Sequence, residues 1–184
     1  MTKTPKIKTF YNDKLNFTNA NSESPFISDK PKRVINYLID CNLFHNFELI
    51  EDFTPYSKQD FYTAHHKEWV DDFFAGKGRL QRRNMLGISW SEEFVESERY
   101  SNSSLYHAIK YSIHNPAQVC FSPTNGFHHA IPKMGALFCA FSGQVRAIRL
   151  SSTNTDCFPA SGQYPAGKHS NAWLLKIPVT EAQN

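Results

Sequence analysis

The sequence predicts one α/β domain of three layers, α/β/α, around a mainly parallel sheet. Two observations predict this class. Segments typical of strands alternate with helical segments along the chain, which is the pattern of layered α/β folds. Residues 117–121 form a short, mostly apolar run bounded by turn residues, as a strand buried on both faces of a parallel sheet does. The length of 184 residues fits one domain of ordinary size.

The first part of the chain is predicted to contain two strands and one helix. Residues 7–11 mix β-branched, aromatic and polar side chains, as a short strand does, and residues 47–53 are the second predicted strand. The stretch up to Asp29 is rich in asparagine and serine, which favours a loop. A helix follows, with Pro31 in its first turn and its end near Asn42. Its apolar residues recur at helical spacing: Val34, Ile35, Leu38 and Ile39.

The middle of the chain is predicted to be helical on both sides of a basic loop. Ser57 and Asp60 have the spacing of a helix start, and two short helical patterns follow them. Residues 77–91 are basic and irregular, which favours a surface loop. Residues 100–113 are predicted to form a helix that ends before Pro116. One face of this helix carries Leu105, Ala108, Ile109 and Ile113.

Composition and charge exclude several kinds of partner. The net charge of +3, from 20 basic and 17 acidic residues, is too small to indicate nucleic-acid binding. The N-terminus lacks the apolar stretch of a signal peptide, and no apolar run is long enough to span a membrane. The four cysteines form no CxxC pair, which argues against a zinc ribbon or a disulfide scaffold. We therefore expect a cytoplasmic protein with no nucleic-acid and no membrane partner.

Two adjacent histidines follow the predicted buried strand. The segment SPTNGFHHA, residues 122–130, places His128 and His129 in a loop at the carboxyl end of that strand, where ligand sites form in open α/β sheets. One imidazole can accept a proton from water while its neighbour holds or donates one, so the two are a candidate acid–base pair. A second pair, His65 and His66, falls in a helical pattern. There we expect one buried and one exposed residue rather than a site.

The sequence around the tandem histidines resembles a known enzyme family. The segments NGFHHA and FCAFSG, at ungapped spacing, resemble the GG(W/F)HHA…GFC.FN segment of the histone deacetylase and acetoin-utilisation deacetylase family, which has an arginase-like fold. The segment PYSKQDFYTAHHKEWVDDFFAGKG is similar to the family's vH…eYv..l region. The resemblance covers residues 7–145 and implies the N-terminal portion of an arginase/deacetylase-like fold, truncated.

The resemblance implies an activity and a set of site residues. Members of this family use zinc to hydrolyse the amide bond of acetylated lysine or polyamine-type amines. His128 and His129 match the two catalytic histidines, which activate the zinc-bound water and stabilise or protonate the intermediate and leaving amine. Gly126 matches a glycine that lets substrate approach the backbone, and Phe138 matches an aromatic residue beside the acyl channel. Both are therefore candidate substrate-binding residues.

The chain departs from the family pattern in three respects, of which the mildest is Ser142 in place of the usual asparagine of the segment that follows. Leu137 stands where the family has the glycine of GFC, and its side chain is expected to narrow or reshape the channel. Beyond Ala130 the only acidic residues are Asp156 and Glu181, and the only histidine is His169. The family's Asp-x-His zinc motif, its further zinc-ligand aspartate and its catalytic tyrosine therefore find no match. We assign no metal ligands in this chain and expect it to be inactive as a hydrolase.

The sequence after Val145 does not continue the family pattern. Residues 146–184 are rich in serine, proline and glycine and lack the expected parallel strand. Our hypothesis is that a frameshift, a recombination or an early stop replaced the rest of the domain. The chain then divides into residues 1–145, the N-terminal part of a deacetylase-like domain, and residues 146–184, a divergent tail, frameshifted or partly disordered. Because a parallel sheet needs its faces and edges covered, a complementary chain or an oligomer is expected on the exposed edge.

Two other functions remain open. The chain could be a non-catalytic interaction module that retains the first half of the fold for binding. It could also hold a metal through an all-histidine site, although nothing in the sequence brings the two histidine pairs together. That site would consist of His65, His66, His128 and His129.

Overall fold

Three strands form one parallel sheet in the order β2-β1-β3. The strands are β1 (Ile7–Phe10), β2 (Phe47–Ile50) and β3 (Cys120–Phe121). In the register of the sheet Ile7 lies opposite Phe47, and Lys8 lies opposite Cys120. This computed structural model describes residues 5–77, 86–124, 127–145 and 147. The α/β class with a parallel sheet is confirmed.

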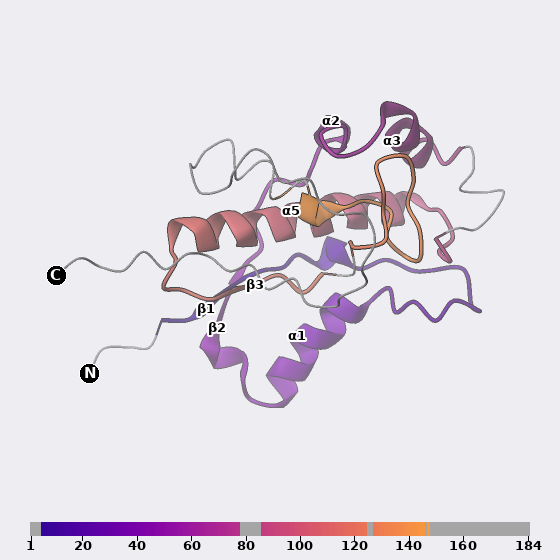
Figure 1. Ribbon diagram of the computed structural model, residues 1–184. Helices are drawn as coiled ribbons and strands as arrows, with labels where there is room; N and C mark the ends of the chain where they lie inside the picture. Colours follow the sequence, from indigo (N-terminus) through magenta and orange to yellow (C-terminus); the bar gives the residue numbers. More distant parts are fainter. Residues whose placement is uncertain (1–4, 78–85, 125–126, 146, 148–184) are drawn as a thin grey trace.

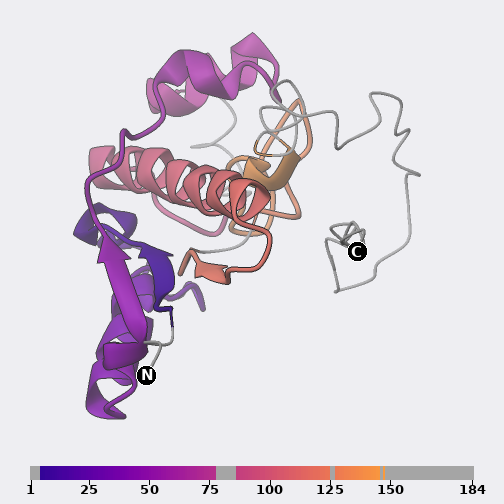
Figure 2. The same cartoon turned by 90° about the vertical axis from the view of Figure 1, so that its left-hand side faces the viewer.

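Helices lie on both faces of the sheet. Figure 1 shows α1 on one side of the strands and α5 on the other, and Figure 2 shows α2 and α3 beyond α5, away from the sheet. Phe10 of β1 lies between sheet and helix: its ring stacks on His107 of α5, 6.0 Å between ring centroids. Two 3-10 turns, η1 and η2, precede α1 and β2. The helical elements are η1 (Asp13–Leu15), α1 (Lys30–Asp40), η2 (Phe44–Asn46), α2 (Lys58–Phe61), α3 (Lys67–Phe74) and α5 (Glu92–His114).

The strand β3 is shorter and less buried than the sequence predicted. Only Cys120 and Phe121 pair with β1, and both are half-buried, whereas Val119 is 70% exposed. In the part of the chain that the structure describes, β3 has a neighbouring strand on one side only. Among the described residues, no second strand covers its outer backbone edge.

The long helix α5 begins at Glu92, well before the predicted start at residue 100. Ser91 is its N-cap, and the Ser91 side chain accepts a hydrogen bond of 3.0 Å from the backbone N–H of Phe94. Glu92 and Glu93 occupy the first turn, where carboxylates complement the helix dipole. The prediction was wrong here because this polar first turn has no apolar periodicity, although it carries a good cap.

Most of the buried residues of α5 are small and polar, and the predicted leucine and isoleucines are not among them. Ala108 is buried as expected, but Leu105 is only half-buried. Serine hydroxyls donate to backbone carbonyls of neighbouring loops and strands, such as Ser104 Oγ to Phe10 O at 2.5 Å. The small side chains let the helix approach the sheet closely, and their hydroxyls satisfy carbonyls that the helix covers. The buried polar residues of α5 are Ser97, Ser101, Asn102, Ser103 and Ser104.

An aromatic core joins α2, α3 and α5 to the segment after the tandem histidines. Phe141 lies at its centre, with ring centroids 4.2 Å from Phe61 and 4.8 Å from Phe73. Phe73 in turn lies 5.3 Å from Phe94 of α5. All four phenylalanines are fully buried. Many of the chain's phenylalanines thus pack in this core. The core holds Phe141 in place, thirteen positions after His128.

Candidate functional site

The tandem histidines lie in an irregular segment that follows β3, at the carboxyl end of the sheet. Its later part, residues 131–139, folds into two tight turns. Ile131 and Met134 exchange two backbone hydrogen bonds of 2.9 and 3.1 Å, and Ala136 and Cys139 exchange two of 3.0 and 2.9 Å. These turns give the segment a fixed shape without helix or strand.

The imidazoles of His128 and His129 contact each other. Their ring centroids are 3.9 Å apart, and the ring planes are inclined by 47°. His128 is exposed and His129 is half-buried. Two adjacent imidazoles can divide the roles of base and acid, and the ring contact keeps both at one place, as the proposed acid–base pair requires.

Cys139 lies directly beneath the two histidines. Its side chain is buried, and burial raises the pKa of its thiol, although the nearby backbone N–H groups of His128 and His129 act in the opposite direction. A thiol in this state stays protonated at neutral pH and is a weak nucleophile. The site therefore offers imidazole chemistry and not cysteine chemistry.

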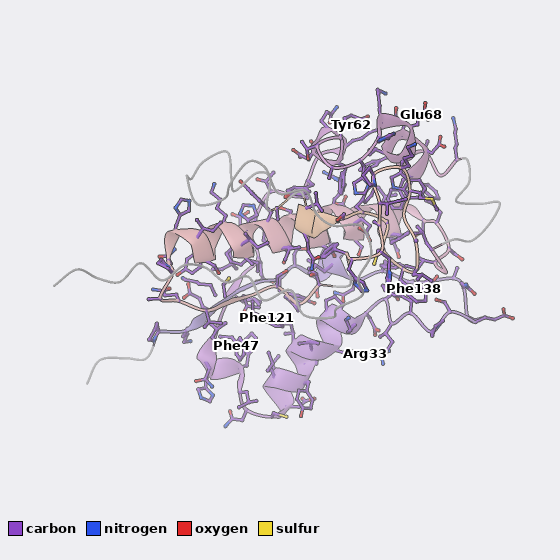
Figure 3. All side chains as sticks on the ribbon, in the orientation of Figure 1. Arg33, Phe47, Tyr62, Glu68, Phe121 and Phe138 are labelled. Carbon is purple, nitrogen blue, oxygen red and sulfur yellow. The ribbon has the colours of Figure 1, made fainter. Side chains whose placement is uncertain are left out.

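Of the two predicted substrate-binding residues, one can be placed. Gly126 lies outside the described residues, as does Asn125. Phe138, labelled in Figure 3, stacks on Phe26 at 5.4 Å between ring centroids. Its ring also covers Gly87, where an added Cβ would come within 2.6 Å of Phe138 Cε1. The ring of Phe138 is thus packed between two other segments of the chain.

The substitution at Leu137 has a clear backbone consequence. Leu137 has φ +46° and Phe138 has φ +70°, so both residues of this turn adopt the left-handed conformation. Glycine adopts that conformation without strain, which is a physical reason for the glycine that the deacetylase pattern has at this position. The Leu137 side chain itself is 58% exposed.

The second histidine pair lies in the turn between α2 and α3 and not inside a helix. His65 is buried and His66, the N-cap of α3, is exposed, as the sequence predicted. His65 Nδ1 lies 3.1 Å from Ile131 O, and His65 Nε2 accepts a hydrogen bond of 2.8 Å from Ser142 N. Because both ring nitrogens of His65 are engaged by the backbone, this histidine cannot ligate a metal, and the all-histidine site is wrong.

The zinc ion that the family resemblance implies does not fit the described residues. A deacetylase-type site requires carboxylate and imidazole ligands around one point. Within residues 5–77, 86–124, 127–145 and 147, no group of three or more His, Cys, Asp or Glu side chains could hold a metal ion. We therefore derive no chemical step through zinc for this chain.

One half-buried acid near the site, Glu98, was missed by sequence reasoning. Burial raises the pKa of Glu98, on α5, to about 8, and the Glu98 charge acts on the Cys139 thiol. Asn102 Nδ2 donates 3.1 Å to Glu98 Oε2, while the buried Asn102 Oδ1 has no hydrogen-bond partner among the described residues. The sequence signal for this polar cluster is the spacing of Glu98 and Asn102, one helical turn apart, among the serines of the same helix.

A cleft of about 450 Å³ lies between α3 and the turn at residues 131–134. It carries side chains of both charges, and neither of the tandem histidines lines it. Glu68, labelled in Figure 3, projects from α3. The lining residues are His66, Glu68, Trp69, Asp72 and Lys133.

Comparison with known proteins bears on the fold. No protein-family model and no curated protein matches the sequence. Among solved structures, the crystal structure of the HDA15 HD domain matches with a TM-score of 0.63 over 82% of this chain. The fold is that of part of a histone deacetylase domain.

The similarity to this deacetylase fold has clear bounds. Sequence identity to the HDA15 HD domain is 14%, so the similarity carries the fold and no chemistry. The chain spans 44% of the length of that domain. The described helices include none that is long and apolar enough to cross a membrane.

Proposed function

We propose that this chain is the tandem-histidine part of a zinc-dependent deacetylase, and that the 184-residue chain alone is inactive. The class hydrolyses the amide bond of acetylated lysine or polyamine-type amines. The observation that carries the proposal is the contact between the rings of His128 and His129, 3.9 Å between centroids, at the carboxyl end of the sheet in a deacetylase-like fold. The three described cysteines are free, which supports a cytoplasmic location.

The chain's own residues supply acid–base groups and their support in this proposal. One ring of the His128–His129 pair accepts a proton from the attacking water, and the other donates one to the leaving amine. Phe138 is proposed to line the acyl channel, and Gly126 to leave room for the substrate backbone. The carboxylates that would hold zinc have no match in this sequence. In this proposal the groups that bind zinc and polarise the substrate carbonyl are therefore residues that the sequence does not contain.

The test compares two proteins in hydrolysis of a fluorogenic acetyl-lysine substrate with added zinc. The first is the 184-residue chain, which should show no turnover above buffer. The second joins residues 1–145 to whichever alternative downstream frame encodes an Asp-x-His motif, and it should turn over substrate and lose activity in His128→Ala. Turnover by the first protein would contradict its proposed inactivity. Failure to find such a frame would contradict the frameshift hypothesis. Full activity of His128→Ala would contradict the role of His128.

A second candidate is a non-catalytic interaction module. The observation that favours it is the edge of β3, where Val119 is 70% exposed. A complementary chain or a second copy that adds a strand there would cover this edge. Light scattering after size exclusion should show a concentration-dependent increase in mass that Val119→Lys abolishes. A monomer at all concentrations, unchanged by Val119→Lys, would leave self-association without support.

A further inference from the structure

His65 joins the two ends of the segment that follows the tandem histidines. Its Nδ1 lies 3.1 Å from the carbonyl oxygen of Ile131, two residues after His129, and its Nε2 accepts a hydrogen bond of 2.8 Å from the N–H of Ser142. The ring also packs edge to face on Phe141, 5.2 Å between centroids. One buried side chain thus fixes positions 131 and 142, which lie on either side of the two tight turns.

Two neighbours of His65, His66 and Trp69, hold the same segment through groups that do not titrate. The backbone N–H of His66 donates to Pro132 O at 2.8 Å, and Trp69 Nε1 donates to Ala140 O at 3.1 Å. Neither of these bonds changes with protonation in the normal pH range, because an amide and an indole N–H keep their protons. His65 is therefore the one titratable group in this set of contacts.

The hydrogen bonds define the tautomer of His65. A backbone N–H can only donate, so Nε2, which faces Ser142 N, carries no proton. A backbone carbonyl can only accept, so Nδ1, which faces Ile131 O, carries the proton. The imidazolium form would place an N–H against the N–H of Ser142, so protonation replaces a hydrogen bond by a repulsive contact of two donors.

We propose that His65 is a positioning residue for His128 and His129, and that it holds their loop only as the neutral Nδ1–H tautomer. Acidification then releases the end of the loop at Ser142. The relevance of His65 to catalysis rests on the proposed function. The release of the loop on protonation of His65 does not, because it requires neither zinc nor substrate.

The surroundings of His65 keep the neutral form over the ordinary pH range. Burial is the main reason that its pKa is lowered to about 4, and the charge of the adjacent His66 lowers it further. The carbonyls of Ile131 and Pro132 act in the opposite direction. Among these causes of the shift, His66 contributes the one charged side chain.

The test follows the Ser142 amide and the imidazole signals of His128 and His129 by NMR during an acid titration of the full chain. In the wild type these signals should shift together in one step, with a midpoint near about pH 4. His65→Gln keeps an acceptor for the Ser142 N–H but cannot titrate there, so its spectrum should resemble the wild type at neutral pH and lack the step. His107→Gln is the matched control, since His107 is half-buried and burial lowers its pKa as it does that of His65, and the step should remain in this variant.

Two results would overturn the proposal. One is a step of unchanged size and midpoint in His65→Gln. The other is His65→Phe with unshifted His128 and His129 signals at neutral pH, because this variant keeps a ring and loses both hydrogen bonds. If His65→Phe does not fold, the comparison of the wild type with His65→Gln still shows whether His65 causes the step. Neither comparison depends on a measurement of hydrolysis.

Discussion

Replacing Glu98 by glutamine should remove a pH-dependent loss of stability. Burial raises the pKa of the Glu98 carboxyl from 4.5 to about 8, so the folded chain binds a proton that the unfolded chain releases. The contribution of Glu98 to the free energy of unfolding is therefore fully retained below about pH 4.5, and it falls as the pH rises towards about 8. With this pKa shift, the free energy of unfolding falls by about 1.5 kcal/mol between about pH 6.5 and about pH 8 because of Glu98. This is an upper value, because part of the Glu98 residue is still accessible to solvent.

The assay is urea unfolding followed by tryptophan fluorescence at these two pH values. Glu98→Gln keeps an oxygen that can accept from Asn102 Nδ2 and has no charge to desolvate. Its unfolding midpoint should therefore not fall between these two pH values, and it should lie above that of the wild type at the higher one. Glu92→Gln, an exposed substitution on the same helix, is the control and should keep the wild-type pH dependence. The pKa values of His65 and His107 are lowered in the folded chain, so in this window both bind protons only when the chain is unfolded. This raises stability with pH equally in the wild type and in Glu98→Gln, and it cancels when the two are compared. The same pH dependence of the midpoint in the wild type and in Glu98→Gln would refute the reasoning.

Three further substitutions test the packing of the same region. Leu137→Gly should stabilise the chain by about 1 kcal/mol, because glycine relieves a left-handed φ of +46° and the lost side chain is 58% exposed; the urea midpoint should rise at constant slope. Gly143→Ala should destabilise by about 1–3 kcal/mol, since the new Cβ would come within 2.6 Å of Asn102 Oδ1, and thermal unfolding measures this. Ser104→Ala should cost about 1–2 kcal/mol in urea unfolding, because it leaves Phe10 O without its 2.5 Å hydrogen bond.

Each of these expectations has a result that contradicts it. Phe138→Gly is the control for Leu137→Gly: it also relieves a left-handed φ but loses the stacked contact with Phe26, so it should destabilise. Equal stabilisation by both glycines would mean that packing of Phe138 contributes nothing. An unchanged melting temperature in Gly143→Ala, or a neutral Ser104→Ala, would mean that these close contacts are relaxed in solution.

The sequence predicted those elements whose signals are local. Ser57 and Asp60 were identified as a helix start, and in the structure the Ser57 N–H and hydroxyl both donate to Asp60 Oδ2, at 2.6 and 2.7 Å. The helix at Pro31 and the strand at residues 7–11 were also found within a residue or two. In each case neighbouring residues carry the whole signal.

The parts that failed depend on contacts distant in sequence. The serines of α5 have no apolar pattern, and only their bonds to carbonyls such as Phe10 O and Thr54 O show why they are buried. The role of His65 as a link between Ile131 and Ser142 depends on a contact across 66 and 77 positions, which no spacing rule reveals.

The candidate site itself was predicted in part. The position of His128 and His129 after a strand was predicted correctly, and their ring contact agrees with it, whereas the roles of Gly126 and Phe138 remain predictions. The tail, residues 146–184, falls outside the described residues except for residue 147, so its origin also remains a hypothesis.

The central claim is that this chain carries the tandem histidines of a deacetylase fold without a zinc site of its own. The most direct measurement is the zinc content of the purified 184-residue chain by elemental analysis after equilibration with zinc and removal of excess metal. The account predicts well below one zinc ion per chain, with no difference between the wild type and His128→Ala. Close to one zinc ion per wild-type chain would contradict it and would show that the chain contains a ligand set that neither the sequence pattern nor the described residues reveal.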